Sequence, residues 1–141
     1  MVFNSDNFIF IVCILFLFYI IFYHNKIESF KDPVVDRLKA DLIKIEPRAA
    51  YLSFNGSTES FSENKKHVYI CLRDKNNEYY PYNMLMYVAL HELAHCMSEQ
   101  VDENHTTDEF KNNFNKYLKL AEQKGIYDSK QPLIYDYCKS N

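Results

Sequence analysis

Two histidines and a glutamate in residues 91–95 have the types and the spacing to do chemistry. The run reads His-Glu-Leu-Ala-His, and on a helix this spacing places both imidazoles on one face, one turn apart. Imidazoles in this arrangement bind zinc in hydrolases, with the intervening glutamate as the general base. We therefore predict that His91 and His95 bind Zn²⁺ and that Glu92 is the catalytic residue and not a ligand.

The residues around this motif indicate a buried helix. From Met84 to Met97 the chain is apolar on every side except at the three motif residues, a pattern typical of a helix in a core. Burying imidazoles and a carboxylate there is costly unless something pairs with them, and a bound cation provides that pairing. The alternative is a metal-free, hydrogen-bonded His-Glu-His cluster.

A catalytic zinc site needs a third protein ligand and leaves its fourth position open. The other histidines are His24, His67 and His105. We predict His105, because residues 98–104 are polar and long enough to reverse the chain, and because Thr106 and Glu109 have the spacing of a capping box that opens a helix. His67 is expected to be an exposed strand residue. An acidic third ligand is the alternative, with these candidates: Asp102, Glu103, Glu109 and Glu122.

Helices and strands are expected in the order α, β, β, α, α. The periodicity predicts a helix from Asp32-Pro33 to just before Pro47, and a strand at 49–54, followed by a polar loop. The motif helix comes after a second strand, and the last helix ends near Gly125. Its apolar side is formed by Phe110, Phe114, Leu118 and Ala121. The expected fold class is α+β.

The strand before the motif helix, residues 66–73, alternates in character. Val68, Ile70 and Leu72 lie on one face of it, which is the pattern of a half-buried strand. By its resemblance to zinc peptidases, in which an edge strand beside the active-site helix pairs with the extended substrate, this segment is a candidate for that edge strand.

The N-terminus carries an uncharged apolar run of 16 residues, 8–23. It predicts a transmembrane anchor, although its length is near the lower limit for a span. A cleaved signal peptide is the alternative, but no Lys or Arg precedes the run. Basic residues follow it, so we expect a single-pass membrane protein whose catalytic domain faces the cytoplasm.

Three regions are expected along the chain. They are a transmembrane anchor at 1–25, a juxtamembrane linker and amphipathic helix at 26–47, and a zinc metallopeptidase-like domain at 48–141. The net charge is −3, and without a clustered basic face the chain has no nucleic-acid footprint. Four cysteines are present. With Cys13 in the anchor, the odd number that remains favours reduced thiols.

Residues 68–127 resemble the small zinc metallopeptidases of the WLM and SprT type, most of all the compact forms of large DNA viruses. In that family a strand leads into the HExxH helix, and a third histidine lies a few residues before a phenylalanine, as His105 and Phe110 do here. This chain lacks the family's Gly-Pro before that histidine and has a longer gap after His95. The resemblance implies a minimal zincin-like domain, in which a small sheet packs on the HExxH helix.

Chemistry and resemblance together predict a membrane-anchored zinc metallopeptidase that hydrolyses peptide bonds, with Glu92 taking a proton from the attacking water. Its expected partners are a protein or peptide substrate and the membrane. Tyr135 and Tyr137 are candidates for stabilising the oxyanion. The alternative function is a non-catalytic, membrane-attached zinc-binding module that binds a partner.

Overall fold

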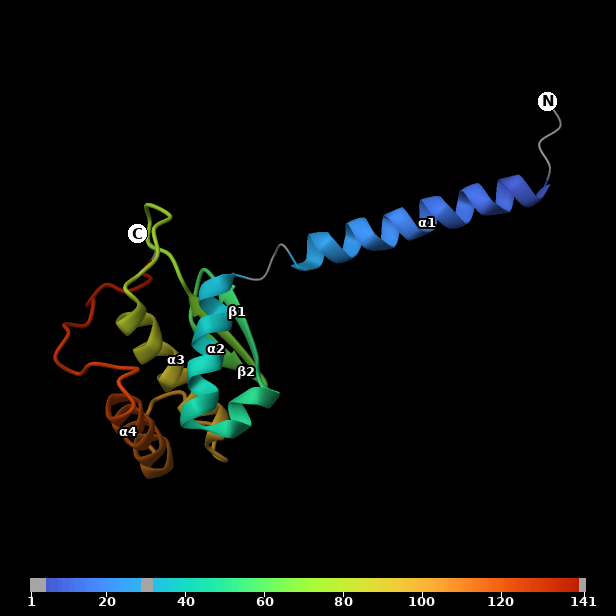
Figure 1. Ribbon diagram of the computed structural model, residues 1–141. Helices are drawn as coiled ribbons and strands as arrows, with labels where there is room; N and C mark the ends of the chain where they lie inside the picture. Colours follow the sequence, from blue (N-terminus) through green and yellow to red (C-terminus); the bar gives the residue numbers. More distant parts are fainter. Residues whose placement is uncertain (1–4, 29–31, 140–141) are drawn as a thin grey trace. The chain divides into compact units, whose positions relative to one another are not determined.

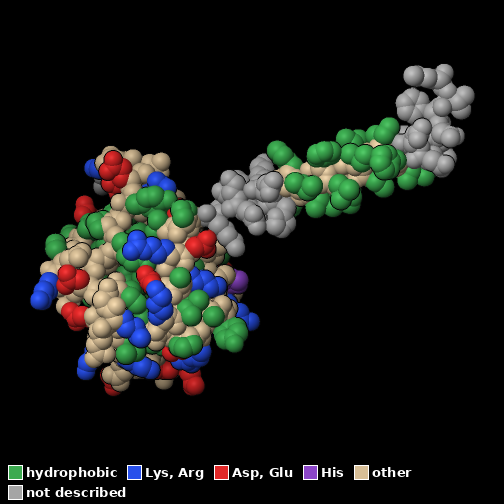
Figure 2. Space-filling view, viewed as in Figure 1, with side chains coloured by type: hydrophobic (Ala, Val, Ile, Leu, Met, Phe, Trp, Pro, Cys, Tyr) green, Lys and Arg blue, Asp and Glu red, His purple; other side chains and the backbone are tan. Residues whose placement is uncertain are grey.

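The computed structural model describes residues 5–28 and 32–139, which fall into two units, Met1–Asp32 and Pro33–Asn141. The first unit contains helix α1 (Ser5–Glu28). Its large apolar side chains between Ile9 and Tyr23 are exposed, and Figure 2 shows them along the helix.

In the part of the chain that the structure describes, no helix is both long and apolar enough to cross a membrane. The predicted transmembrane anchor is therefore wrong. The same correction applies to the predictions built on it, namely the anchored fold, the single-pass location and the cytoplasmic orientation. The physical reason is the length of the uncharged apolar run, 8–23, which is shorter than α1 itself. Its 16 residues, at about 1.5 Å each, cover about 24 Å, whereas the hydrocarbon core of a membrane is about 30 Å thick.

The second unit is α+β, and its strands form one small sheet. Strands β1 (Ser53–Ser57), β2 (Phe61–Glu63) and β3 (His67–Cys71) are arranged in the order β1-β3-β2. Strand β3 pairs in parallel with β1 and antiparallel with β2. The tight connection between β2 and β3 is possible because Asn64 and Lys65 adopt positive φ values of 51° and 54°. Strand β3 is therefore central, and β2 is an edge.

Helices α2 (Pro33–Ile45), α3 (Tyr82–Met97) and α4 (Asp108–Gln123) complete this unit, as Figure 1 shows. Both α2 and α3 contact the sheet, and α4 packs on α3. The core between them is made of fully buried aliphatic side chains, among them Leu38, Leu42, Val68, Ile70, Leu85, Leu90 and Leu93. Val68 and Ile70 are the alternate residues of β3, so the predicted inward face of this strand is confirmed.

Several local predictions differ from the structure. The predicted strand at 49–54 is largely the 3-10 helix η1 (Pro47–Tyr51), which Pro47 opens, and β1 begins only at Ser53. Strand β2 occupies part of the segment expected to be a polar loop. The prediction that 66–73 is the edge strand is wrong, because β3 is paired on both sides.

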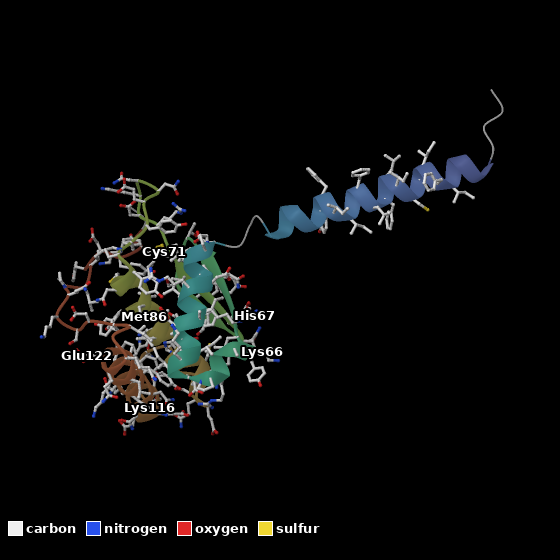
Figure 3. The ribbon with its side chains drawn as sticks, viewed as in Figure 1. Lys66, His67, Cys71, Met86, Lys116 and Glu122 are labelled. Carbon is white, nitrogen blue, oxygen red and sulfur yellow. A yellow bond between two sulfur atoms is a disulfide. The ribbon has the colours of Figure 1, made fainter. Side chains whose placement is uncertain are left out.

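The C-terminal segment returns to the end of β3. A disulfide joins Cys71 (labelled in Figure 3) to Cys138, so the expectation of reduced thiols is wrong for this pair. The Tyr137 ring packs on Tyr80, with 4.7 Å between the ring centroids, and the Cys138 amide donates to the Tyr80 hydroxyl at 3.0 Å. Cys96 is a free, buried thiol, so the expectation of reduced thiols holds for this residue.

Candidate metal centre

The three histidines predicted as ligands lie together in the structure. His91 and His95 come from α3, and His105 comes from the segment between α3 and α4. Their Nε2 atoms converge: His91 lies 3.0 Å from His105 and 3.2 Å from His95. One ligand atom of each histidine lies within 4.8 Å of the others, so the cluster could hold a metal ion.

These distances suit a small tetrahedral cation. Two nitrogens bound about 2.05 Å from such an ion lie roughly 3.3 Å apart, close to the separations seen here. Hydrogen bonding fits less well, because a neutral imidazole nitrogen is either a donor or an acceptor, and the His91 Nε2 faces two others. The donor set and its spacing therefore fit a metal such as zinc.

The protonation state of the histidines also favours a bound metal ion. Burial, helped by the charges of His95 and His105, lowers the pKa of His91 to about 4. Burial and His105 also lower the pKa of His95. Both imidazoles are therefore neutral at pH 7, which is the form that binds a cation.

The ring of Phe110, in α4, packs against the three histidines. This ring stacks on His95, with centroids 4.3 Å apart, and lies 5.1 Å from the rings of both His91 and His105. Phe110 is 3 % exposed, so α4 places one buried aromatic ring against all three imidazoles.

Glu92 is buried beside the histidines, on the neighbouring face of α3. It is 6 % exposed, and burial raises the pKa of its carboxyl to about 7, while a hydrogen bond with Ser62 lowers it in part. Ser62 belongs to the edge strand β2. A carboxylate with a pKa near the working pH is suited to accept and return a proton.

The cluster opens into a cavity of about 740 Å³. One side is lined by β2 and the turn after it, through Phe61, Ser62 and Lys65, and the other by residues 100–105. Lys65 joins the two sides, because its ammonium donates to the carbonyl oxygens of Ser98 and Glu99. The three histidines and Glu92 therefore line a groove bounded by an edge strand.

Three of the four acidic candidates for the third ligand make hydrogen bonds to other groups. Asp102 accepts from Thr106 and Thr107. Glu109 accepts from the amides of Glu99 and Gln100, so it does not form the predicted capping box. The box fails because the N-cap of α4 is Thr107, whose hydroxyl accepts from the Phe110 amide. Glu122 bonds the Ser129 hydroxyl, and Glu103 is exposed at the cavity rim.

His67 and the two candidate tyrosines do not line this cavity, although the charge of Glu92 acts on Tyr137. His67, labelled in Figure 3, is exposed and bonds the Ser53 hydroxyl at 2.6 Å. Tyr135 is 90 % exposed. The Tyr137 hydroxyl bonds Ser60 and the carbonyl of Cys71, and burial raises its pKa to about 12. The side chain of His24 lies outside the described residues.

Sequence reasoning missed Ser62 and the structural use of Asp102. Ser62 lies in a strand of only three residues, too short for alternation to reveal. Asp102 was considered only as a metal ligand. The signal for this structural use that the sequence offered was the position of Asp102, three residues before His105.

The chain is similar to two viral proteins of the same kind of virus. It is 34 % identical over 94 residues to the uncharacterized protein 136R of Invertebrate iridescent virus 6, covering 64 % of this chain and 51 % of the relative. It is 38 % identical over 81 residues to the uncharacterized protein 042R of Invertebrate iridescent virus 3, covering 57 % and 49 %.

The chain thus spans about half the length of the curated relatives it matches. No family model matches it, and no solved structure does.

Proposed function

We propose that this protein is a zinc-dependent metallopeptidase of the HExxH type, similar to the WLM and SprT enzymes. The observation that carries the proposal is the convergence of the His91, His95 and His105 Nε2 atoms on one point at the wall of a cavity that also contains Glu92. Zinc, when bound, would make water a nucleophile near neutral pH and polarise the substrate carbonyl.

Glu92 would then act as the general base. Its carboxylate takes a proton from the attacking water and returns it to the departing amine. The hydrogen bond with Ser62 orients this carboxylate. A purely structural zinc site has no use for a carboxylate in this place, so Glu92 favours an enzyme over a non-catalytic zinc-binding module.

The edge strand β2 would bind the substrate. Phe61 and Ser62 line the cavity, and β2 has β3 on one side only. An extended peptide could therefore add to the sheet there, held by backbone hydrogen bonds. This moves the predicted pairing from β3 to β2 and favours unfolded segments as substrates.

The test is cleavage of an unfolded protein by the full chain loaded with zinc and by its Glu92→Gln variant. We expect the variant to keep zinc and fold but to lose activity by about 10²-fold or more, because general-base catalysis is worth this much. Removing zinc with a chelator should have the same effect. Equal cleavage by both forms would refute the role of Glu92, and bound zinc without any cleavage would favour the non-catalytic module.

A further inference from the structure

His105 differs from the other two ligands in the way it is held. His91 and His95 are fixed by α3, whereas His105 lies in the connection between α3 and α4 and is exposed. Its backbone has a φ of 56°, a left-handed conformation that a residue other than glycine keeps only when its surroundings enforce it. Something outside a helix must therefore hold this residue.

The Asp102 carboxylate is the group in position to do so. One oxygen accepts from the Thr106 amide at 3.0 Å, and the other accepts from the Thr107 amide and hydroxyl at 2.8 and 2.7 Å. Asp102 is 7 % exposed. A buried carboxylate that precedes His105 in the chain thus accepts hydrogen bonds from the two residues that directly follow His105. These bonds close the backbone around His105 into a turn.

The same bonds connect His105 to the rest of the site. Thr107 is also the N-cap of α4, since its hydroxyl accepts from the Phe110 amide at 3.3 Å. Phe110 in turn contacts all three imidazoles. The carboxylate therefore sets the position of His105 relative to the helix that supports the other two ligands.

We propose that Asp102 is a positioning residue that holds His105 for metal binding, so that the affinity of the site for zinc depends on its carboxylate. The proposal rests on the proposed function in so far as the metal is zinc. Asp102 does not itself bind the metal in this arrangement. It acts through the backbone of residues 105–107.

Glu103 provides a matched control. It is the adjacent acid, lines the same cavity and is exposed. Replacing either acid removes one negative charge near the histidines. Only the replacement of Asp102 also releases the amides of Thr106 and Thr107, so the pair separates positioning from simple charge attraction.

The experiment measures zinc affinity of the full chain by competition with a chromophoric chelator. We expect Asp102→Ala to weaken binding about 10- to 100-fold, as is usual when the support of a ligand is lost. Glu103→Ala should stay close to the original affinity. Asp102→Asn keeps an oxygen acceptor and should recover part of the loss. With Co²⁺ as probe, Asp102→Ala should show weaker visible absorption, because more than one water enters where His105 is no longer held and the coordination number rises above four.

Equal affinities for Asp102→Ala and the unchanged protein would overturn the proposal, as would equal losses in Asp102→Ala and Glu103→Ala. If the unchanged chain binds no zinc, the proposed function fails. Hydrogen exchange of the metal-free protein then decides the role of Asp102. Protection of the Thr106 and Thr107 amides that is lost in Asp102→Ala but kept in Glu103→Ala supports it, and unprotected amides in the unchanged chain overturn it.

Discussion

The residues of the candidate metal centre are held in place by more than one physical cause. The helical repeat brings His91 and His95 to one face of α3. His105 depends on a hydrogen-bonded turn, through Thr106 and Thr107. Burial prepares the site, since it lowers the pKa values of His91 and His95, which keeps these two imidazoles neutral, and raises the pKa of Glu92 to about 7.

At this scale the prediction concerns the third ligand. The full chain should bind about one zinc, held by three protein ligands, and His105→Ala should retain far less after dialysis, measured by atomic absorption. His67→Ala is the control, because His67 is exposed and bonds Ser53. Stoichiometric zinc in His105→Ala would move the third ligand to another residue.

Among the elements, α4 does more than cover α3. It places Phe110 against the three imidazoles, and it begins at the N-cap Thr107, which is held by Asp102. Strand β2 contributes Ser62 to Glu92 and forms one side of the cavity. The site is therefore assembled between a helix, a turn and an edge strand.

We predict that Phe110→Ala lowers the free energy of unfolding by about 3–5 kcal/mol, since it removes a buried aromatic side chain and leaves a cavity. Urea denaturation followed by circular dichroism measures the change. Val101→Ala is the control, because Val101 is an apolar side chain beside the candidate metal centre but is 81 % exposed. A loss below about 1 kcal/mol for Phe110→Ala, the usual size of an average substitution, would show that the α3–α4 contact is weaker than the structure indicates.

For the molecule as a whole, the disulfide between Cys71 and Cys138 joins residues 67 positions apart. It ties the C-terminal segment to the end of the central strand. The segment makes further contacts with the motif helix, where the Asp128 amide donates to Asn83 and the Ile134 amide to the Met84 sulfur. The C-terminal segment is thereby linked to both the sheet and α3.

Breaking this link should destabilise the second unit. We expect Cys138→Ser to cost about 2–5 kcal/mol in the free energy of unfolding, the usual range for a lost native disulfide. Thermal unfolding, with and without a reducing agent, measures it, and reducing agent should affect only the form that carries the bond. Cys13→Ser, which changes an exposed free thiol, should behave like the unchanged chain.

The sequence by itself determined what depends on near neighbours along the chain. The HExxH spacing defines one helical face, the prolines at 33 and 47 bound α2, and alternation shows which side of β3 is buried. The tertiary structure alone decided that β2 forms an edge, that Asp102 holds the turn at His105, and that Cys71 meets Cys138. Strand order and disulfide pairing join segments far apart in sequence, and a three-residue strand or a capping carboxylate leaves no periodic pattern, so local propensity carries no signal for them.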